Sequence, residues 1–249
     1  MSAPIYLLLG GTGGIGAPLA RRLAADGATV VLGARDADRL SALADETGAK
    51  AFTLDATDAD AVSGLVDAAV KEYGRIDGAI NLVGSILLKP AHATSPDEFD
   101  ETLTMNLKTA FYLVRAAAKA MQSNRDPEGG SIVLMSSVAG RYGLSNHEAI
   151  AAAKAGVEGL VRAAAATYAP KGVRVNAVAP GLVRTPLAGR LVATEQAVEA
   201  SAKLHPLGRI GEPDDLRDAL AFLLNRDASG WVTGQTLSVD GGFATVRPR

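Results

Sequence analysis

The first residues of the chain form an apolar run that leads directly into a cluster of glycines. Ile5 to Leu9 is uninterrupted apolar sequence, as expected for a strand buried on both faces of a parallel sheet. The cluster GGTGGIG follows, and residues 17–27 show the pattern of an amphipathic helix that closes at Gly27. This order of strand, glycine loop and helix predicts the first unit of an α/β fold.

The glycine cluster predicts a binding site for the phosphates of a dinucleotide. Glycines let the backbone approach a pyrophosphate closely, and a helix start offers free N–H groups and the positive end of the helix dipole. Glycines alone are weak evidence, because many tight turns carry several, but their place between a buried strand and a helix favours nucleotide binding over a structural turn. The residues predicted to bind the phosphates are Gly10, Thr12, Gly13, Gly14, Ile15 and Gly16.

The residues after the second predicted strand, residues 29–32, indicate which dinucleotide binds. In NAD enzymes an acidic residue usually ends this strand and binds the ribose, whereas here Ala34 holds that position and Arg35 follows it. A guanidinium can pair with a 2′-phosphate, so the sequence favours NADP(H) over NAD(H). The alternative is that Arg35 is a solvated surface arginine, and the neighbouring Asp36 would weaken such a pocket.

Strands and helices continue to alternate along the chain. A single long helix is predicted over residues 96–122, with Ser95 as its cap, and an alanine-rich helix ends near Pro170. The pattern predicts a doubly wound (Rossmann) sheet of seven parallel strands with right-handed crossovers, in one domain covering residues 1–249. The predicted strands cover residues 5–9, 29–32, 51–54, 78–83, 131–135, 173–178 and 237–239.

One long segment departs from this alternation. Residues 180–211 contain several prolines and glycines, with a short helical pattern over residues 195–203. A segment of this length beyond the carboxyl end of a strand usually covers a binding site. We therefore expect residues 186–210 to form a lid.

The composition excludes several kinds of site. The chain has no cysteine, which rules out disulfides, thiol nucleophiles and cysteine-bound metals, and its histidines form no metal-ligand pattern. The formal net charge of −2 gives no reason to expect a nucleic acid or an anionic membrane as partner. The apolar run at the N-terminus is too short for a signal peptide or a membrane span, so we expect a cytoplasmic protein.

Several motifs, in the right order, resemble the short-chain dehydrogenase/reductase family over essentially the full length of the chain. The resemblance is greatest to the branch of β-ketoacyl-carrier-protein reductases and of sugar or polyol dehydrogenases. Residues 81–84 read NLVG, and match the family's Asn-Asn-Ala-Gly segment at its first and last positions. The matching residues are Gly10, Gly14, Gly16, Asp55, Asn81, Gly84, Asn106, Ser137, Lys154, Asn176, Pro180, Gly181, Thr185 and the closing VDGG of residues 239–242.

The resemblance implies an oxidoreductase that acts on a small molecule with a nicotinamide cofactor. In such enzymes the lysine, here Lys154, binds the nicotinamide ribose, the serine, here Ser137, polarises the substrate oxygen, and the asparagine, here Asn106, holds a water. Relatives commonly form homotetramers through the two helices that carry the asparagine and the lysine. The resemblance further assigns cofactor contacts to Asp55, Asn81, Gly84, Pro180, Gly181 and Thr185.

The family's tyrosine, its proton donor, is absent. It lies thirteen residues after the serine and four before the lysine, and counting from Ser137 or from Lys154 leads to the same residue, Ile150. The two counts agree, so this is a substitution and not a shift in register. Isoleucine cannot donate a proton, and the loss of a positioned general acid typically costs about 10²–10⁴-fold in rate.

Three other side chains and water are candidates to replace the missing tyrosine as proton donor. His147 lies seven residues before Lys154, about two helical turns, which is the spacing of the tyrosine in enoyl-carrier-protein reductases. The competing interpretation, that His147 caps or precedes the helix in solvent, is slightly favoured. Tyr142 is expected in a loop, Glu148 is expected to complement the helix dipole, and water is a further proton source.

Two classes of function remain open from the sequence. The first is an NADP(H)-dependent oxidoreductase with an altered proton-donor site, which reduces a carbonyl, activated C=C or C=N compound. The second is a nucleotide-binding protein without redox turnover, a sensor or partner subunit; retention of Ser137 and Asn106 argues mildly against it. A lyase or isomerase on the same scaffold is a third possibility, and the substrate is not revealed.

Overall fold

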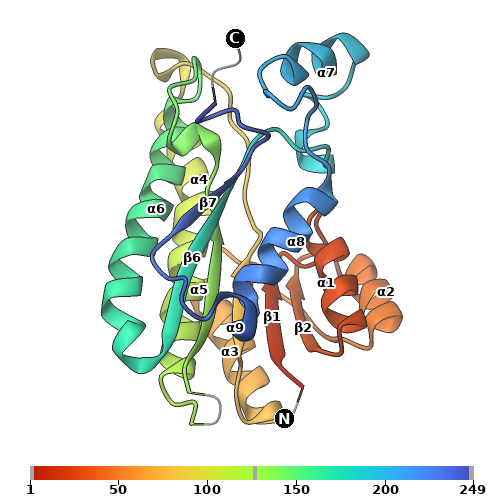
Figure 1. Ribbon diagram of the computed structural model, residues 1–249, viewed down its shortest axis with the longest axis vertical. Helices are drawn as coiled ribbons and strands as arrows, with labels where there is room; N and C mark the ends of the chain where they lie inside the picture. The colour runs from red at the N-terminus through yellow and green to blue at the C-terminus, as the bar shows by residue number, and fades with distance from the viewer. Residues whose placement is uncertain (1–2, 126–127, 247–249) are drawn as a thin grey trace.

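All seven strands are present in the computed structural model, which describes residues 3–125 and 128–246. They pair in parallel in the order β3-β2-β1-β4-β5-β6-β7, and Figure 1 shows the sheet running through the centre of the molecule. The strands are β1 (Ile5–Leu9), β2 (Thr29–Ala34), β3 (Lys50–Thr53), β4 (Gly78–Asn81), β5 (Gly130–Met135), β6 (Val173–Pro180) and β7 (Thr236–Val239).

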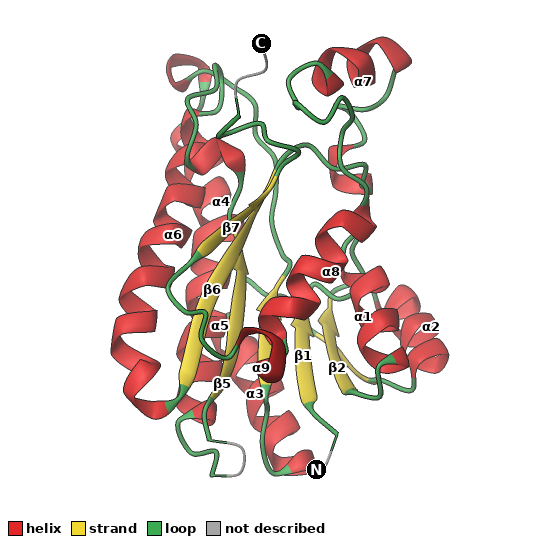
Figure 2. Ribbon diagram, in the orientation of Figure 1, coloured by secondary structure: helices red, strands yellow, loops and turns green. Residues whose placement is uncertain are grey.

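Helices cover both faces of the sheet, which confirms the doubly wound α/β prediction (Figure 2). One face packs on α3 (Ala59–Tyr73), α5 (Thr109–Met121) and α6 (Glu148–Tyr168). The other packs on α1 (Gly16–Ala25), α2 (Ala37–Thr47) and α8 (Pro213–Leu224). The remaining elements are α4 (Pro96–Leu103), α7 (Glu195–Ala202), α9 (Arg226–Ser229), a π-helical turn η2 (Thr104–Lys108), and the 3₁₀ turns η1 (Ala91–Ala93), η3 (Val138–Gly140), η4 (Ala169–Lys171) and η5 (Pro186–Ala188).

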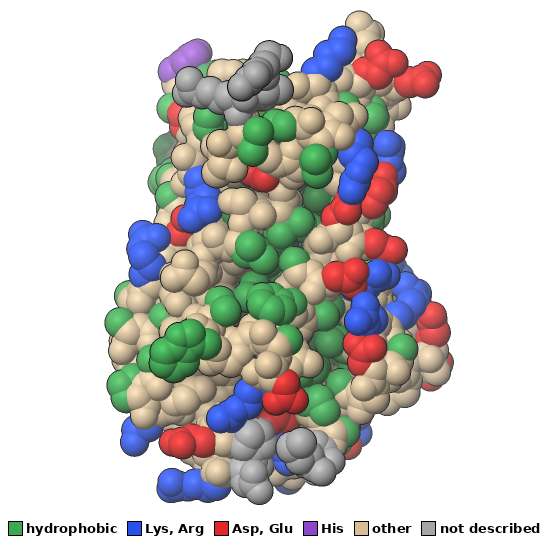
Figure 3. Space-filling view, in the orientation of Figure 1, with side chains coloured by type: hydrophobic (Ala, Val, Ile, Leu, Met, Phe, Trp, Pro, Cys, Tyr) green, Lys and Arg blue, Asp and Glu red, His purple; other side chains and the backbone are tan. Residues whose placement is uncertain are grey.

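The outer faces of α1, α2 and α8 carry charges of both signs, visible along the right-hand side of Figure 3. Arg22 of α1 pairs with Asp218 of α8 at 2.9 Å, and Arg21 pairs with Glu46 of α2 at 2.6 Å. All four side chains are well exposed, so each pair contributes little to stability. The buried apolar faces of these helices therefore hold them on the sheet.

The single long helix predicted over residues 96–122 is interrupted, and this prediction was wrong in detail. Ser95 caps its start through a reciprocal capping box with Glu98, as expected. Residues 104–108, however, form a π-helical turn between α4 and α5. A π turn widens the helix locally, and such turns are frequent at functional sites.

The fourth strand is shorter than predicted, since β4 ends at Asn81 and not at residue 83. The Asn81 side chain explains the early end. Its Oδ1 accepts the backbone N–H of Val83 at 3.0 Å, and its Nδ2 donates to Thr109 Oγ1 at 3.0 Å. The side chain thus turns the backbone away from the sheet and fixes it to α5.

Among the described residues, no helix is both long and apolar enough to cross a membrane. Within the same part of the chain, no group of three or more His, Cys, Asp or Glu side chains is arranged to hold a metal ion.

We predict that Leu8→Ala lowers the free energy of unfolding by about 2–5 kcal/mol. Leu8 is fully buried in β1, an inner strand of the sheet, next to Gly11 of the glycine loop, and its truncation leaves a cavity. Urea denaturation followed by circular dichroism measures the effect. Leu204, which is 60% exposed, is the matched control, and Leu204→Ala should change the free energy by less than about 0.5 kcal/mol. Equal effects of the two changes would contradict the assigned core.

Candidate functional site

A cleft of about 750 Å³ opens at the carboxyl ends of β1, β2 and β4. The strand order reverses between β1 and β4, and ligands of open α/β sheets bind at such a reversal. Most of the predicted cofactor-binding residues line this cleft. They are Gly10, Thr12, Gly13, Gly14, Ile15, Gly16, Arg35, Asp55, Gly84 and Thr185.

The glycine loop fits a pyrophosphate. Helix α1 begins after Ile15 without a side-chain cap and has no acidic residue in its first turn. Ala17 already donates its N–H to the carbonyl oxygen of Gly13 and residue 18 is a proline, so the N–H of Gly16 is the one at the helix start that is available to an anion among the described residues. Gly10 adopts a φ of 81°, a conformation that favours glycine. A Cβ on Gly16 would lie 2.6 Å from the carbonyl oxygen of Gly11, so only glycine permits this tight loop.

The start of the lid closes over the loop. A Cβ on Gly14 would lie 2.7 Å from Pro186 and 3.1 Å from Thr185. Thr185 also accepts the backbone N–H of Ala188 and so caps η5. The structure thus brings Thr185 to the phosphate loop, although the two are far apart in sequence.

The far end of the lid is anchored by a buried histidine. His205 is only 4% exposed. Its Nδ1 lies 2.8 Å from the carbonyl oxygen of Ser201, and its Nε2 accepts the N–H of Leu182 at 3.3 Å. A Cβ on Gly181 would lie 2.6 Å from Nε2. Gly181, at the end of β6, therefore acts through the packing of the lid.

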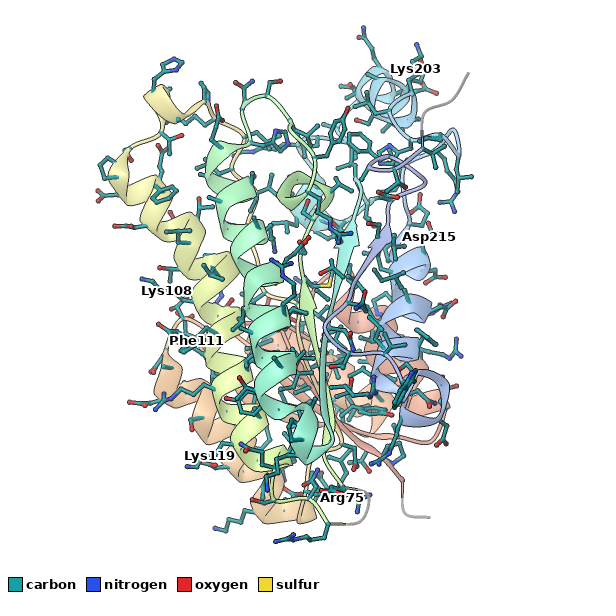
Figure 4. All side chains as sticks on the ribbon, turned by 60° about the vertical axis from the view of Figure 1, so that its left-hand side comes forward. Arg75, Lys108, Phe111, Lys119, Lys203 and Asp215 are labelled. Atoms are coloured by element: carbon teal, nitrogen blue, oxygen red, sulfur yellow. The ribbon has the colours of Figure 1, made fainter. Side chains whose placement is uncertain are left out.

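An ion pair ties the same end of the lid to α8. Arg209 pairs with Asp215, with its Nη1 2.6 Å from the carboxylate, and Asp215 lies at the start of α8 (Figure 4). Hydrogen bonds from Arg209 and from the N–H of Glu212 lower the pKa of Asp215 to about 2. Helix α7, which ends beside Lys203, projects beyond the carboxyl ends of the strands (Figures 1 and 4).

Two arginines stand where the resemblance implies that the ribose binds. Arg35 is exposed at the rim of the cleft. Asp36 is engaged as the cap of α2, where its Oδ1 accepts the N–H of Arg39 at 3.0 Å. Arg39 donates from Nη2 to the carbonyl oxygen of Thr12 at 2.7 Å and so joins α2 to the glycine loop. The sequence interpretation missed Arg39, because its contact joins residues 27 positions apart and no local pattern signals it.

Asp55 lies at the rim of the cleft at the end of β3. Its Oδ1 accepts the backbone N–H and the hydroxyl of Thr57, each at 2.9 Å. These two hydrogen bonds lower the pKa of Asp55, with a smaller contribution from the charge of Arg35. The carboxylate is thus ionised and fixed in place at neutral pH.

Asn106 lies in the π turn and holds the segment that follows β4. Its Oδ1 accepts the N–H of Ser85 at 3.2 Å, and its Nδ2 donates to Ser85 Oγ and to the carbonyl oxygen of Thr102, both at 2.9 Å. A Cβ on Gly84 would lie 2.9 Å from Asn106 Oδ1 and 3.7 Å from Lys154 Nζ. Asn106 and Lys154 therefore approach the same point of the backbone, at Gly84.

Lys154 is buried without a carboxylate partner. Its Nζ donates to the carbonyl oxygen of Met135 at 2.9 Å, and this is its one hydrogen bond to the described residues. Burial lowers the pKa of Lys154 from 10.5 to about 8. The amine is thus close enough to neutrality to exchange a proton near physiological pH.

The two serines at the end of β5 have different environments. Ser136 donates its hydroxyl to Glu158 at 2.9 Å, and Glu158 also accepts from Arg141 at 3.1 Å. Ser137 is half-buried, and its Oγ accepts the N–H of Ala139 at 3.2 Å. The hydroxyl proton of Ser137 has no acceptor among the described residues, so it is available to a substrate oxygen.

Ile150 is 5% exposed and faces the protein interior one turn before Lys154. His147 caps α6, and its Nδ1 lies 2.7 Å from the carbonyl oxygen of Ser145. Because a carbonyl only accepts, Nδ1 carries a proton, and the neutral ring has only an acceptor left at Nε2. Tyr142 is 48% exposed, and its ring packs edge-on against Phe243 with centroids 5.7 Å apart.

Known proteins resemble this chain over nearly its whole length. A family model described as Enoyl-(Acyl carrier protein) reductase matches residues 10–244. The chain is 37% identical over 247 residues to cis-4-hydroxycyclohexanecarboxylate dehydrogenase of Sinomonas cyclohexanicum, with 97% of each chain covered. It is 34% identical over 248 residues to the 3-oxoacyl-[acyl-carrier-protein] reductase FabG of Thermotoga maritima, with 98% of each chain covered.

Solved structures share the whole fold. A short-chain type dehydrogenase/reductase from Mycobacterium ulcerans has a TM-score of 0.92 and 31% identity, with 99% of this chain and 92% of that chain covered. ElxO with NADP bound has a TM-score of 0.90 and 28% identity, with 98% and 100% covered. The likeness therefore extends from the glycine loop through the lid to β7.

We predict that Lys154→Met stabilises the protein without bound ligand at pH 7, and that the advantage shrinks at high pH. Below pH 8 Lys154 is charged in the folded and the unfolded chain, so folding carries the full cost of burying the charge. Between pH 8 and 10.5 only the unfolded chain keeps the proton, so the free energy of unfolding of the wild type rises.

Urea denaturation of both proteins at pH 7 and pH 10.5 measures this change. The difference in free energy of unfolding should move by about 3 kcal/mol in favour of the wild type. Lys71→Met, a change on the exposed side of α3, should show no such dependence on pH. A constant difference between wild type and Lys154→Met would show that Lys154 keeps an ordinary pKa.

Proposed function

The chain belongs to the short-chain dehydrogenase/reductase family, and we propose that it uses NADP(H) to reduce a small carbonyl, activated C=C or C=N compound. The observation that carries the proposal is the convergence of Lys154 and Asn106 on Gly84, at the edge of a cleft that fits a dinucleotide. When bound, the nicotinamide supplies the hydride, and the chain supplies position and electrostatics.

Three side chains carry the proposed chemistry. Lys154 holds the nicotinamide ribose and brings a positive charge to the carboxyl edge of β5, next to Met135. Ser137 donates a hydrogen bond from its free hydroxyl to the substrate oxygen, on which negative charge develops during hydride transfer. Asn106 holds the segment after β4 in place and, as in relatives, contributes to a chain of hydrogen bonds that brings protons to the site.

NADP(H) is the proposed cofactor because of the charge at the rim of the cleft. Arg35 and Arg39 stand at the end of β2 and the start of α2, and Asp36 is occupied as a helix cap. The guanidinium of Arg35 is exposed and suits a 2′-phosphate. A solved relative, ElxO, has NADP bound.

The substitution of Ile150 for tyrosine changes which substrates suit the site. Without a phenol one turn before Lys154, a carbonyl oxygen must receive its proton from another group. An activated C=C or C=N bond is protonated at carbon or nitrogen, so its proton donor need not stand where the phenol would. His147 is a second candidate donor in its protonated form, because its neutral ring offers Nε2 only as an acceptor.

We propose an apolar substrate, because the lid exposes large apolar side chains. Leu187 lines the cleft and is 57% exposed, and Leu204 and Leu207 are more exposed still. Monomeric proteins seldom expose such residues in one segment unless they contact a ligand or a partner. A relative named for a hydroxylated cyclohexanecarboxylate suggests that ring ketones belong among the first compounds to test.

A homotetramer is the proposed assembly. Phe111 on the outer side of α5 is 50% exposed and lies between Lys108, at the end of η2, and Lys119 of α5 (Figure 4). Phe99 of α4 is 39% exposed. These residues and the small side chains of α6 suit close pairing with a second copy, which sedimentation at micromolar concentration would test.

We predict that Arg35→Ser weakens NADPH binding about 10–100-fold and leaves NADH binding nearly unchanged, because it removes a charge-assisted bond to the 2′-phosphate. Titration of cofactor fluorescence measures both affinities. Arg21→Ser is the control, since Arg21 lies on the outer face of α1 and pairs with Glu46. Equal losses for the two cofactors would mean that Arg35 does not contact the 2′-phosphate.

The oxidoreductase proposal is tested by NADPH oxidation with ring ketones, enones and imines, on the wild type and on Ile150→Tyr. We expect turnover by the wild type with at least one class, and ketone reduction about 10²-fold or more faster with the tyrosine. Tight NADPH binding by a wild type that transfers hydride to no acceptor would instead favour the alternative, a nucleotide-binding protein without redox turnover.

A further inference from the structure

The hydroxyl of Ser85 is unusual among the polar groups near Lys154. Ser85 follows Gly84, and Gly84 lines the cleft. Asn106 forms two hydrogen bonds with Ser85: its Oδ1 accepts the backbone N–H, and its Nδ2 donates to Oγ. Both hydrogens of the Asn106 amide are used, one on Ser85 Oγ and one on the carbonyl oxygen of Thr102. Asn106 is 1% exposed, so this grip is shielded from water and holds the Ser85 side chain in a fixed position.

Ser85 Oγ is an acceptor in this grip, so its own proton is left to donate. Among the described residues, Ser85 Oγ accepts one hydrogen bond and donates none, whereas Ser136 has its proton committed to Glu158. A hydroxyl that accepts a bond from an amide is also a better donor, because the bond stabilises the negative charge left on the oxygen.

A proton source lies close to this hydroxyl. Lys154 Nζ lies within 4 Å of the point where a Cβ on Gly84 would stand, and Ser85 is the next residue. Lys154 has one hydrogen bond, to the Met135 carbonyl, which leaves two of the three N–H groups of its charged form to donate. A single bridging water can connect the Lys154 ammonium to the Ser85 hydroxyl.

We infer that Ser85 is the proton-relay residue that takes the place of the missing tyrosine. The inference rests on the proposed oxidoreductase function. Hydride moves from the reduced cofactor to the substrate carbon, and the Ser85 O–H proton moves to the substrate oxygen. Ser85 regains a proton from the Lys154 ammonium through a bridging water, and Lys154 is reprotonated from solvent. Ser137 orients the same oxygen from the end of β5.

The other donors are less suited to this task. Tyr142 packs on Phe243 at the outer rim and is half-exposed, and His147 directs its Nδ1 proton to its own loop. Ile150 has no polar atom. Ser85 is the one side chain in the described part of the chain that combines a free hydroxyl proton, a hydrogen bond from Asn106 and a place directly after Gly84, which Lys154 Nζ approaches.

The relay is tested by Ser85→Ala, with Ser85→Thr to keep the hydroxyl and Ser123→Ala as an exposed control. With the best acceptor for the wild type, Ser85→Ala should lower kcat about 10²-fold or more. Ser85→Thr and Ser123→Ala should stay near the wild type. NADPH affinity, measured by fluorescence, should be unchanged in all three. The unfolding temperature should fall for Ser85→Ala, which leaves a buried Asn106 N–H without its acceptor, and should stay near the wild type for Ser85→Thr and Ser123→Ala.

The Ile150→Tyr background separates a relay from a structural role. A tyrosine at residue 150 supplies its own proton, so adding Ser85→Ala to it should have little effect on kcat, whereas adding Ser137→Ala should still lower kcat. If Ser85→Ala lowers kcat equally in both backgrounds, or weakens NADPH binding as well, Ser85 is structural and the inference fails.

Further outcomes are equally decisive. A wild type that turns over and is unaffected by Ser85→Ala overturns the relay alone, and a loss confined to His147→Ala would assign the proton to His147. A wild type that binds NADPH but transfers hydride to no acceptor overturns the proposed function, and the relay with it.

Discussion

Between β1 and β4 the chain stops adding strands on one side of the sheet and begins to add them on the other. The segments that leave these two strands must diverge, and the space between them is the cleft that holds the glycine loop. Because all seven strands are parallel, every loop that follows a strand emerges at the same end. This constraint brings Gly14, Gly84, Ser137 and Thr185 together at the carboxyl ends of the strands.

At this end of the sheet Lys154 carries a buried positive charge, which lowers the stability of the protein. Lys154 has a carbonyl group as its one described partner, and burial lowers its pKa to about 8. A carboxylate would relieve this cost, but the nearest buried one, Glu158, is directed to Ser136 and Arg141. Groups whose pKa is shifted toward neutrality by burial are typical of sites that transfer protons.

Residue 150, where the family resemblance implies a tyrosine, is an isoleucine, and the polar groups near it have separate partners. Ser136 and Glu158 fix the end of β5 to α6, and Asn106 fixes Ser85 to the π turn. Ile150 is 5% exposed and has no polar atom, so in the proposed mechanism the proton comes from Ser85, and Lys154 lies one turn further along α6.

The sequence by itself determined the order of strands and helices, the phosphate loop and the absence of a tyrosine at residue 150, because these depend on local periodicity and on spacing along the chain. Only the tertiary structure decided the burial of His205, the contact of Arg39 with Thr12, and the grip of Asn106 on Ser85. These contacts join residues 21 to 27 positions apart, or depend on packing between elements, and no local pattern encodes such distances. The π turn that carries Asn106 was not apparent from the sequence either, since the apolar pattern continues through it.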